Sequence, residues 1–335
     1  MKIALITGVT GQGGVYLSQL LLQKGYRVVG TSRDARFANR NGLESLGISA
    51  DVEVVSLLLH DRRRVEDVID ELRPNEIYHL AAPSSVARSF HEPSETTEDI
   101  VMSTVNILES IRRIDARIRF FNAASTEMFG DSPLPIDEES RLNPYSPYGV
   151  AKSAAFLQTR NYRDAYDTYT CSGIFSNFES ALRPANFVTS KIVSAATRIA
   201  SGEKMTLRLG NTEIYRDWGF AGDYVEAAWR MLQLDQPGDL VIATGEMHSL
   251  KDFIEITFEL IGKDPHQYVT TDDSLLRPLD IKRSVGNPAR AEQQLGWRAR
   301  HDLRETIRKM FDAHPQLLTD TTTTTSANVM PFPNN

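Results

Sequence analysis

Apolar and polar positions alternate along the chain in a way that predicts strands and helices in regular succession. Short apolar runs that end at glycine or polar residues are typical of buried strands, and they occupy residues 2–7, 27–31, 52–57, 76–80, 118–123 and 170–175. Apolar residues at helical spacing lie between these runs, at 15–24, 63–72, 100–114 and 152–165. Strands that alternate with helices at this spacing predict an α/β protein with a doubly wound parallel sheet of Rossmann-like type.

The second half of the chain has shorter elements. Residues 177–184 read as a polar loop on the ligand side, and further helices are expected at 187–201, 223–233, 250–261 and from 286 to about 296, with strands at 204–209 and 240–244. We therefore expect a dinucleotide-binding Rossmann domain in residues 1–176, to which 212–245 returns. Residues 177–211 and 246–318 would form a smaller mixed α/β substrate domain. The threonine-rich tail, 319–335, has almost no apolar pattern and is expected to be disordered.

Composition narrows the range of functions. The 335 residues are 41% hydrophobic and 24% charged, as in ordinary globular proteins, and the net charge of -7 argues against nucleic acid as the main partner. No apolar stretch approaches the ~20 residues needed to cross a membrane, so we expect a cytoplasmic protein. Cys171 is the only cysteine, which excludes an intramolecular disulfide, and no metal-ligand spacing is present.

A glycine-rich turn follows the first predicted strand and precedes the first predicted helix. Gly8, Gly11 and Gly14 form a G-x-x-G-x-x-G pattern that also includes Thr10 and Gln12. Glycines in this context let the backbone approach a pyrophosphate at the start of a helix. The fourth strand ends in small residues that leave room for the same ligand, in the segment Leu80-Ala81-Ala82. The sequence therefore predicts a dinucleotide site.

The end of the second strand indicates which nicotinamide cofactor fits. An acidic residue there would bind the ribose 2′-hydroxyl of NAD, whereas this chain has Ser32 and Arg33. A guanidinium can pair with a 2′-phosphate, which favours NADP. The prediction requires that the carboxylate of the following residue, Asp34, points away from that phosphate.

Two short segments carry the candidate chemistry. Tyr148 and Lys152 are four residues apart and would share one face of a helix, so we expect the ammonium to lower the pKa of the phenol. Ser125, Thr126 and Glu127 follow the fifth strand, at the edge where such sheets bind ligands. Glu127 would add a second proton-handling group, which a simple alcohol dehydrogenase does not need.

Taken together, these motifs resemble the extended short-chain dehydrogenase/reductases and, within them, the GDP-mannose 4,6-dehydratase family. The resemblance extends to about residue 300 and is most specific at 7–17, 146–152 (Ser-Pro-Tyr-Gly-Val-Ala-Lys), 177–180, 187–189, 209–211, 216–227 and 243–246. It implies oxidation of the sugar at C4, elimination of water across C5 and C6, and return of the hydride to C6. In that reaction Tyr148 would be the base at C4, Ser125 and Thr126 would assist there, and Glu127 would remove the C5 proton.

The resemblance also assigns binding residues. It implies that Arg183 contacts the cofactor, and that substrate contacts come from Ser84, Asn177, Val188, Lys191, Asn211, Arg216, Arg277 and Asp280. Lys191 and Arg216 would meet the pyrophosphate, and Arg277 with Asp280 the ribose and phosphate of the nucleoside. Arg33, Arg36 and Arg40 lie in a segment that crosses between subunits in the family, which implies a homodimer or homotetramer.

Several positions depart from the family pattern and leave alternatives open. They are Gly13, Leu58, Pro83, the order Ser125-Thr126, Phe178 and Asp280. The main hypothesis is an NADP-dependent GDP-mannose 4,6-dehydratase. The alternatives are a GDP-4-keto-6-deoxy-mannose reductase, a dehydratase for another GDP-sugar such as a heptose, and a non-catalytic NADP-binding regulator.

Overall fold

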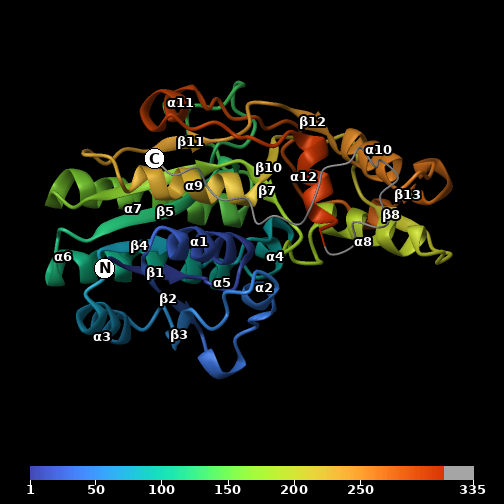
Figure 1. Ribbon diagram of the computed structural model, residues 1–335. Coiled ribbons are helices and arrows are strands. Elements are labelled where there is room, and N and C mark those ends of the chain that lie inside the picture. The colour runs from blue at the N-terminus through green and yellow to red at the C-terminus, as the bar shows by residue number, and fades with distance from the viewer. Residues whose placement is uncertain (313–335) are drawn as a thin grey trace.

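A seven-stranded parallel sheet forms the centre of the protein, whose computed structural model describes residues 1–312 (Figure 1). The strand order is β11-β6-β5-β4-β1-β2-β3. The strands are β1 Ile3–Thr7, β2 Arg27–Ser32, β3 Val52–Ser56, β4 Glu76–His79, β5 Arg119–Ser125, β6 Thr170–Phe175 and β11 Leu240–Ile242. The order reverses between β1 and β4, so the chain leaves these two strands on opposite sides and a crevice opens at their carboxyl ends.

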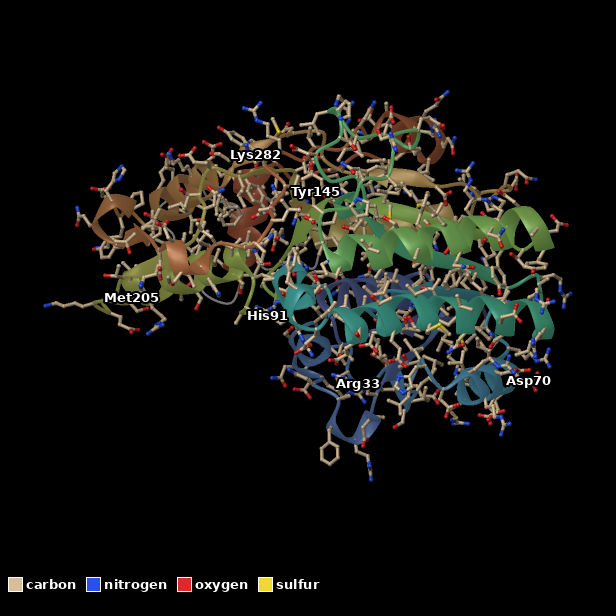
Figure 2. The ribbon with its side chains drawn as sticks, turned by 180° about the vertical axis from the view of Figure 1, so that it is seen from behind. Arg33, Asp70, His91, Tyr145, Met205 and Lys282 are labelled. Atoms are coloured by element: carbon tan, nitrogen blue, oxygen red, sulfur yellow. The ribbon has the colours of Figure 1, made fainter. Side chains whose placement is uncertain are left out.

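Helices cover both faces of this sheet. On one face α1 (Gln12–Gln23) and α9 (Ala221–Met231) share a core with β1, β2 and β6. On the other face lie α3 (Arg62–Leu72), α6 (Ser103–Ile114) and α7 (Pro147–Tyr166), and Figure 2 shows α6 and α7 lying across it. The shorter helices are α2 Asn41–Ser45, α4 Val86–His91, α5 Pro93–Thr97 and α11 Ala289–Leu295. The doubly wound fold is confirmed.

A smaller lobe with its own hydrophobic core adjoins the carboxyl ends of the strands. Its helices are α8 Val188–Ala200, α10 Leu250–Leu260 and α12 Leu303–Met310, which pack around Trp218, Phe253 and Phe258. Its strands form two-stranded pairs, β8 Leu207–Leu209 with β13 Val269–Thr271 (parallel) and β9 Tyr215–Arg216 with β12 His248–Ser249 (antiparallel). The prediction of a smaller, mixed α/β region is therefore also confirmed.

The structure corrects two predictions about elements and adds one helix. Residues 177–184 are not all loop, because β7 (Asn177–Glu179) pairs with β10 (Trp218–Phe220). The helix expected at 100–114 instead begins as a π-helical turn, Glu98–Met102, before α6. Helix α12 was not predicted, although Asp302 and Glu305 form a capping box at its start. A three-residue strand has too short a pattern to be recognised without knowledge of its distant partner.

Neither a membrane helix nor a metal cluster is found in residues 1–312. None of the helices in this range is long and apolar enough to cross a bilayer. The same range contains no group of three or more metal-ligating side chains. The tail for which disorder was predicted, 319–335, lies outside the described residues.

Candidate active site

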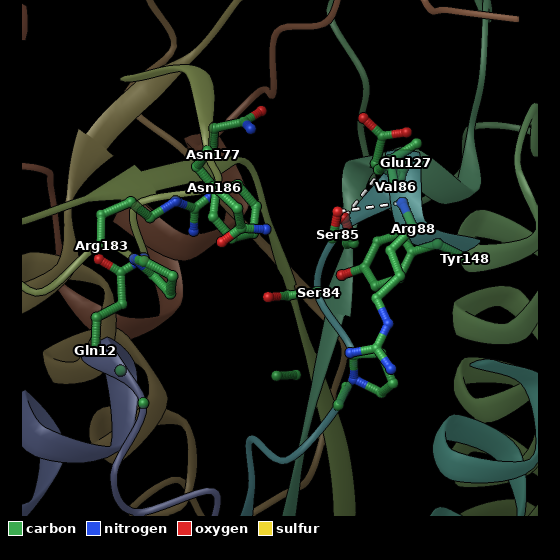
Figure 3. A pocket seen from close by; sticks show the side chains of 18 of the residues that line it. Gln12, Ser84, Ser85, Val86, Arg88, Glu127, Tyr148, Asn177, Arg183 and Asn186 are labelled. Carbon is green, nitrogen blue, oxygen red and sulfur yellow. Dashed lines mark hydrogen bonds between the residues drawn. The ribbon is translucent and has the colours of Figure 1, made fainter. Parts of the chain in front are cut away.

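A cavity of about 1250 Å³ runs along the carboxyl ends of the sheet and reaches the smaller lobe. Figure 3 shows Glu127 and Tyr148 on one wall, with Gln12 and Arg183 on the other. The cavity brings together nearly all the predicted site residues: Gly8, Thr10, Gly11, Gln12, Gly14, Arg33, Leu80, Ala81, Ala82, Ser84, Ser125, Glu127, Tyr148, Lys152, Asn177, Arg183, Val188, Lys191, Asn211, Arg216, Arg277 and Asp280. Thr126 is the exception, because its side chain is buried beneath the wall.

The glycine turn has the shape that a dinucleotide requires. Gly8 has a φ of +74°, which glycine adopts without strain, and a Cβ there would lie 2.9 Å from the backbone of Ala81. A Cβ on Gly14 would lie 2.4 Å from the carbonyl oxygen of Gly8. Side chains at these two positions would therefore clash with the neighbouring backbone. The backbone at the start of α1 therefore faces the cavity without side chains in between, as a pyrophosphate site needs.

Gln12 has a structural contact that the sequence did not indicate. Its amide nitrogen donates to the carbonyl oxygen of Phe178 (2.9 Å), and its amide oxygen accepts from the Ser180 hydroxyl (2.7 Å). The side chain predicted to touch the cofactor thus fastens residues 178–180 to the start of α1. The Phe178 ring also lies close to Gly13, where a Cβ would be 3.7 Å away.

Tyr148 is placed by the start of helix α7. The Ser146 hydroxyl caps this helix by accepting from the Gly149 N–H (3.0 Å), and Pro147 occupies its first turn. A Cβ on Gly149 would lie 2.6 Å from the carbonyl oxygen of Glu127. This glycine therefore lets α7 approach the segment after β5 closely. The contact places Tyr148 and Glu127 on one wall of the cavity.

The pKa of Tyr148 differs from the prediction. Burial raises the pKa of the Tyr148 phenol to about 12, and the nearby Glu127 adds to the rise, whereas a hydrogen bond from Ser125 and the charge of Arg183 oppose it. Burial lowers the pKa of Lys152 to about 8, and its ammonium donates to the carbonyl oxygen of Ala123 (2.7 Å). The Lys152 ammonium also lies 5.8 Å from the centre of the Tyr148 ring, but in the protein alone burial raises the pKa of Tyr148, contrary to the predicted lowering.

Glu127 has the environment of a proton-handling carboxylate. It lies two residues after Ser125, the last residue of β5, and the Ser125 hydroxyl accepts from its backbone N–H (3.2 Å). Burial raises the pKa of the Glu127 carboxyl above its ordinary value, while Arg216 and Arg277 oppose this and Asp280 adds to it. A carboxyl whose pKa is raised by burial can serve as an acid/base group in catalysis.

Arg183 belongs to a buried cluster that the sequence analysis missed. Its Nε lies 3.2 Å from Glu179 Oε2, and its guanidinium lies 3.7 Å from the centre of the Phe187 ring. Glu179 is buried and also accepts from the Thr189 hydroxyl (2.8 Å). The four-residue spacing of Glu179 and Arg183 gave no signal of this pair, because such spacing brings side chains together only on a helix and this segment is a strand and a turn. Together these contacts hold Arg183 against the cavity wall.

The segment after β2 keeps the Asp34 carboxylate away from Arg33. Asp34 accepts from Arg36 through Nη2 (2.7 Å) and Nε (3.1 Å), so it forms an ion pair on the outer side of the loop. Arg33 itself lines the cavity. Arg40 donates to the carbonyl oxygens of Ser49 and Val52 in the same chain. The Asp34 carboxylate is therefore engaged by Arg36.

On the substrate side of the cavity, Asp280 contacts two arginines. One oxygen of this carboxylate, Oδ1, lies 3.0 Å from Arg216 Nη2 and 3.2 Å from Arg277 Nη1. Asp280 and Arg277, which the resemblance assigns together to the ribose and phosphate of the nucleoside, thus contact each other, and Asp280 also contacts Arg216. Lys191 and Asn211 line the same end of the cavity.

Comparisons with known proteins agree with this geometry. The family model described as GDP-mannose 4,6 dehydratase matches residues 5–310. GDP-mannose 4,6 dehydratase 1 of Arabidopsis thaliana is 40% identical over 326 residues, which cover 94% of this chain and 90% of the relative. The human GDP-mannose 4,6 dehydratase is 36% identical over 343 residues, covering 95% and 92%.

Solved structures share the fold. UDP-glucose 4-epimerase of Thermus thermophilus, in complex with NAD, has a TM-score of 0.80 and 26% identity, and covers 92% of this chain and 98% of the epimerase. The dTDP-glucose 4,6-dehydratase of Bacillus anthracis, with NAD, has a TM-score of 0.80 and 20% identity, with coverage of 93% and 99%. The protein has a nicotinamide dinucleotide-binding fold, and the chain belongs to the GDP-mannose 4,6-dehydratase family.

Proposed function

We propose that this protein is an NADP-dependent GDP-mannose 4,6-dehydratase that forms GDP-4-keto-6-deoxy-mannose. The observation that carries the proposal is the position of Glu127 beside Tyr148 on one wall of the dinucleotide cavity. Oxidation at C4 needs one base, and elimination of water across C5 and C6 needs a second acid/base group. Family membership gives independent support.

The proposed roles follow from the contacts of each side chain. Tyr148, hydrogen-bonded by Ser125, takes the proton of the C4 hydroxyl. A bound nicotinamide dinucleotide supplies the hydride acceptor at C4 and the hydride donor at C6. Glu127 removes the C5 proton, which the C4 ketone has made acidic, and donates a proton to the departing C6 hydroxyl. Lys152 fixes the end of β5 against α7 through its bond to Ala123.

We propose NADP as the cofactor because of the charges after β2. Arg33 lines the cavity, and Asp34 is engaged by Arg36, so a 2′-phosphate meets a guanidinium without a competing free carboxylate. In the Arg33→Ala variant we expect the Kd for NADP to rise at least about tenfold while the Kd for NAD stays unchanged, as measured by fluorescence titration. An equal rise for both cofactors would contradict the assignment.

The decisive experiment is incubation with GDP-mannose and only catalytic NADP, followed by mass spectrometry. Loss of one water from the nucleotide sugar is the expected result. A reductase would instead need stoichiometric NADPH and a substrate that is already oxidised, and a regulator would bind NADP without turnover. If GDP-mannose keeps its mass while the protein holds cofactor, the proposal fails. A GDP-heptose, supplied in parallel, tests the alternative sugar.

We also propose that the protein acts as a homo-oligomer. Large apolar side chains are exposed on the outer side of α7 and next to α6: Met102, Val150 and Leu157, each between 44% and 53% exposed. Val150 and Leu157 are seven residues apart and share one helical face. Light scattering should show a dimer or tetramer, and the double variant Val150→Asp, Leu157→Asp should shift it toward the monomer. A monomeric native protein would contradict the proposal.

A further inference from the structure

A pair of polar side chains joins two segments that are far apart in the sequence, the start of α1 and the segment that follows β6. The Gln12 amide nitrogen donates to the Phe178 carbonyl oxygen (2.9 Å), and the Ser180 hydroxyl donates to the Gln12 amide oxygen (2.7 Å). We call these two hydrogen bonds the clasp. Gln12 and Ser180 are 168 positions apart and only 7% and 1% exposed, so water has little access to the clasp.

The direction of both hydrogen bonds in the clasp is fixed by chemistry. A carbonyl oxygen can only accept, so the amide nitrogen of Gln12 must face Phe178 and its amide oxygen must face Ser180. The Ser180 oxygen also accepts from the backbone N–H of Leu182 (3.2 Å). Both polar atoms of the Gln12 side chain thus have partners in residues 178–180. Turning this side chain toward a ligand would leave buried polar groups unpaired, which is costly.

The segment that the clasp holds carries side chains of the cavity wall. Asn177 lies at one end of this segment and Arg183 just beyond the other, and both line the cavity. Figure 3 shows them on the same wall as Gln12, opposite Tyr148. The backbone N–H of Arg183 donates to the Ser180 carbonyl oxygen (3.0 Å), so the turn that carries Arg183 starts at a residue of the clasp. Ser180 itself is buried behind this wall.

We propose that the clasp sets the position of Asn177 and Arg183 relative to Tyr148 on the opposite wall. Gln12 and Ser180 are therefore positioning residues, which act through the side chains that they hold. The side chain of Gln12 has this role in place of the predicted contact with the cofactor. The inference rests on the proposed function, since the reaction that it serves is the dehydration of a nucleotide sugar. Misplacement of bound groups by about 1 Å can cost about a hundredfold in rate.

The first test compares the turnover of GDP-mannose by Ser180→Ala and by the wild type, both loaded with NADP. We expect kcat to fall about 5- to 20-fold and KM to stay within about threefold, because the ligands keep their contacts but lose their alignment. A merely structural role would lower stability and leave both constants of the folded protein unchanged, and that result would overturn the proposal. The matched control is Ser110→Ala in α6, which removes a hydroxyl that is also 1% exposed and donates to the Asn106 carbonyl oxygen (2.8 Å). Its kcat should stay within about twofold of the wild type.

The second test uses Gln12→Met, which keeps an unbranched side chain and removes both hydrogen bonds of the clasp. Combined with Ser180→Ala, it should turn over no more slowly than Gln12→Met alone, because the two substitutions break the same contact. The Kd for NADP, measured by fluorescence titration, should stay within about threefold in both single variants. If Gln12→Met weakens NADP binding tenfold or more, or if the two losses of kcat multiply in the double variant, Gln12 acts on the ligands independently of Ser180 and the clasp is overturned.

Hydrogen–deuterium exchange gives a readout that does not depend on turnover. In Ser180→Ala the backbone amides of residues 178–183 should exchange at least about threefold faster than in the wild type, whereas Ser110→Ala should leave their exchange unchanged. Unchanged exchange in Ser180→Ala would overturn the clasp even in an active enzyme. A wild type that binds NADP but leaves GDP-mannose intact would overturn the proposed function and the positioning role with it, while faster exchange would still show that the clasp holds this segment.

Discussion

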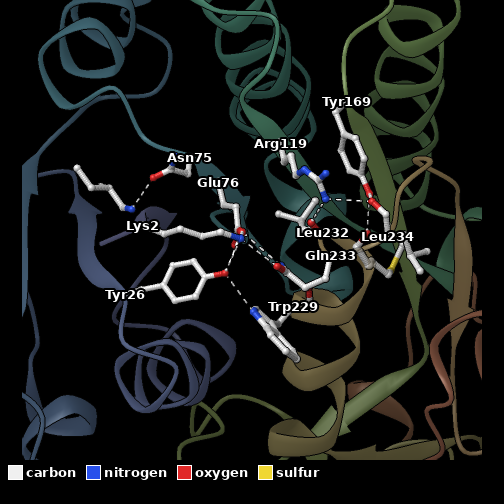
Figure 4. A network of polar contacts seen from close by, with 12 residues as sticks. Lys2, Tyr26, Asn75, Glu76, Arg119, Tyr169, Trp229, Leu232, Gln233 and Leu234 are labelled. Atoms are coloured by element: carbon white, nitrogen blue, oxygen red, sulfur yellow. Dashed lines mark hydrogen bonds and ion pairs between the residues drawn. The ribbon is translucent and has the colours of Figure 1, made fainter. Parts of the chain in front are cut away.

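Two glutamates stand at opposite ends of the same parallel sheet and have opposite surroundings. Glu76 begins β4 at the amino end and is 1% exposed. Figure 4 shows the donors that surround it. Its Oε1 accepts from Lys2 (3.0 Å), Tyr26 (2.9 Å) and Gln233 (3.3 Å), and its Oε2 accepts from Tyr78 (2.7 Å). A buried carboxylate with this many donors holds segments together and has little freedom to exchange protons.

Glu127 lies just after β5, at the carboxyl end of the sheet, and is not surrounded by hydrogen-bond donors in this way. Within residues 1–312 its carboxylate accepts no hydrogen bond, and burial raises the pKa of this carboxyl. The contrast teaches how to distinguish two kinds of buried carboxylate. One that is saturated with donors contributes to stability, whereas one that lies unpaired in a cavity is available for chemistry.

The largest effect is expected for Glu127→Gln. An amide cannot take the C5 proton, so turnover of GDP-mannose should fall by about 10²-fold or more, while NADP still binds. Water loss followed by mass spectrometry measures the rate, and fluorescence titration measures cofactor affinity. A variant that keeps near-normal turnover would show that Glu127 does not act as the base.

The same substitution at the amino end of the sheet, Glu76→Gln, should lower the stability of the protein. It removes the charge opposite Lys2 and leaves buried donors poorly matched, which should lower the free energy of unfolding by about 1–3 kcal/mol. Urea unfolding measures this change. Turnover of the folded fraction should stay close to that of the wild type. If Glu76→Gln instead lost turnover a hundredfold and kept its stability, Glu76 would be a functional residue and the contrast with Glu127 would not hold.

The pH dependence of stability should reveal the environment of Glu127. The pKa of Glu127 in the folded protein lies above its ordinary value of 4.5. Its contribution to stability is therefore fully present below that ordinary value and is lost as pH rises through the folded value. Glu127→Gln should be more stable than the wild type at pH 7, with a difference that shrinks as pH falls toward 4.5. Melting temperatures between pH 8 and pH 5 test this, and a less stable Glu127→Gln at pH 7 would contradict it.

The smallest effect is expected for Lys2→Met, which removes one partner of Glu76. The Lys2 side chain is 52% exposed, so solvent screens the ion pair, and its loss should cost less than about 1 kcal/mol. Urea unfolding beside Glu76→Gln provides the comparison. A cost equal to that of Glu76→Gln would show that the network depends on the ion pair rather than on the neutral donors Tyr26 and Tyr78.

The sequence alone determined the sheet, its helices and the residues that line the cavity. Local apolar period and glycine spacing follow from backbone geometry, which acts over a few residues and can be read directly. For this reason Gly8 after β1, Glu127 after β5 and Tyr148 at the start of α7 lie where the local pattern predicts them.

The tertiary structure alone decided how the charges pair and which short strands form. Asp280 meets Arg216 across 64 positions of sequence, and β7 finds its partner β10 some 40 residues later. The direction of the Lys152 side chain likewise depends on β5, which the four-residue spacing from Tyr148 does not reveal. Electrostatic interactions depend on distance and burial, and both are set only when remote segments are brought together.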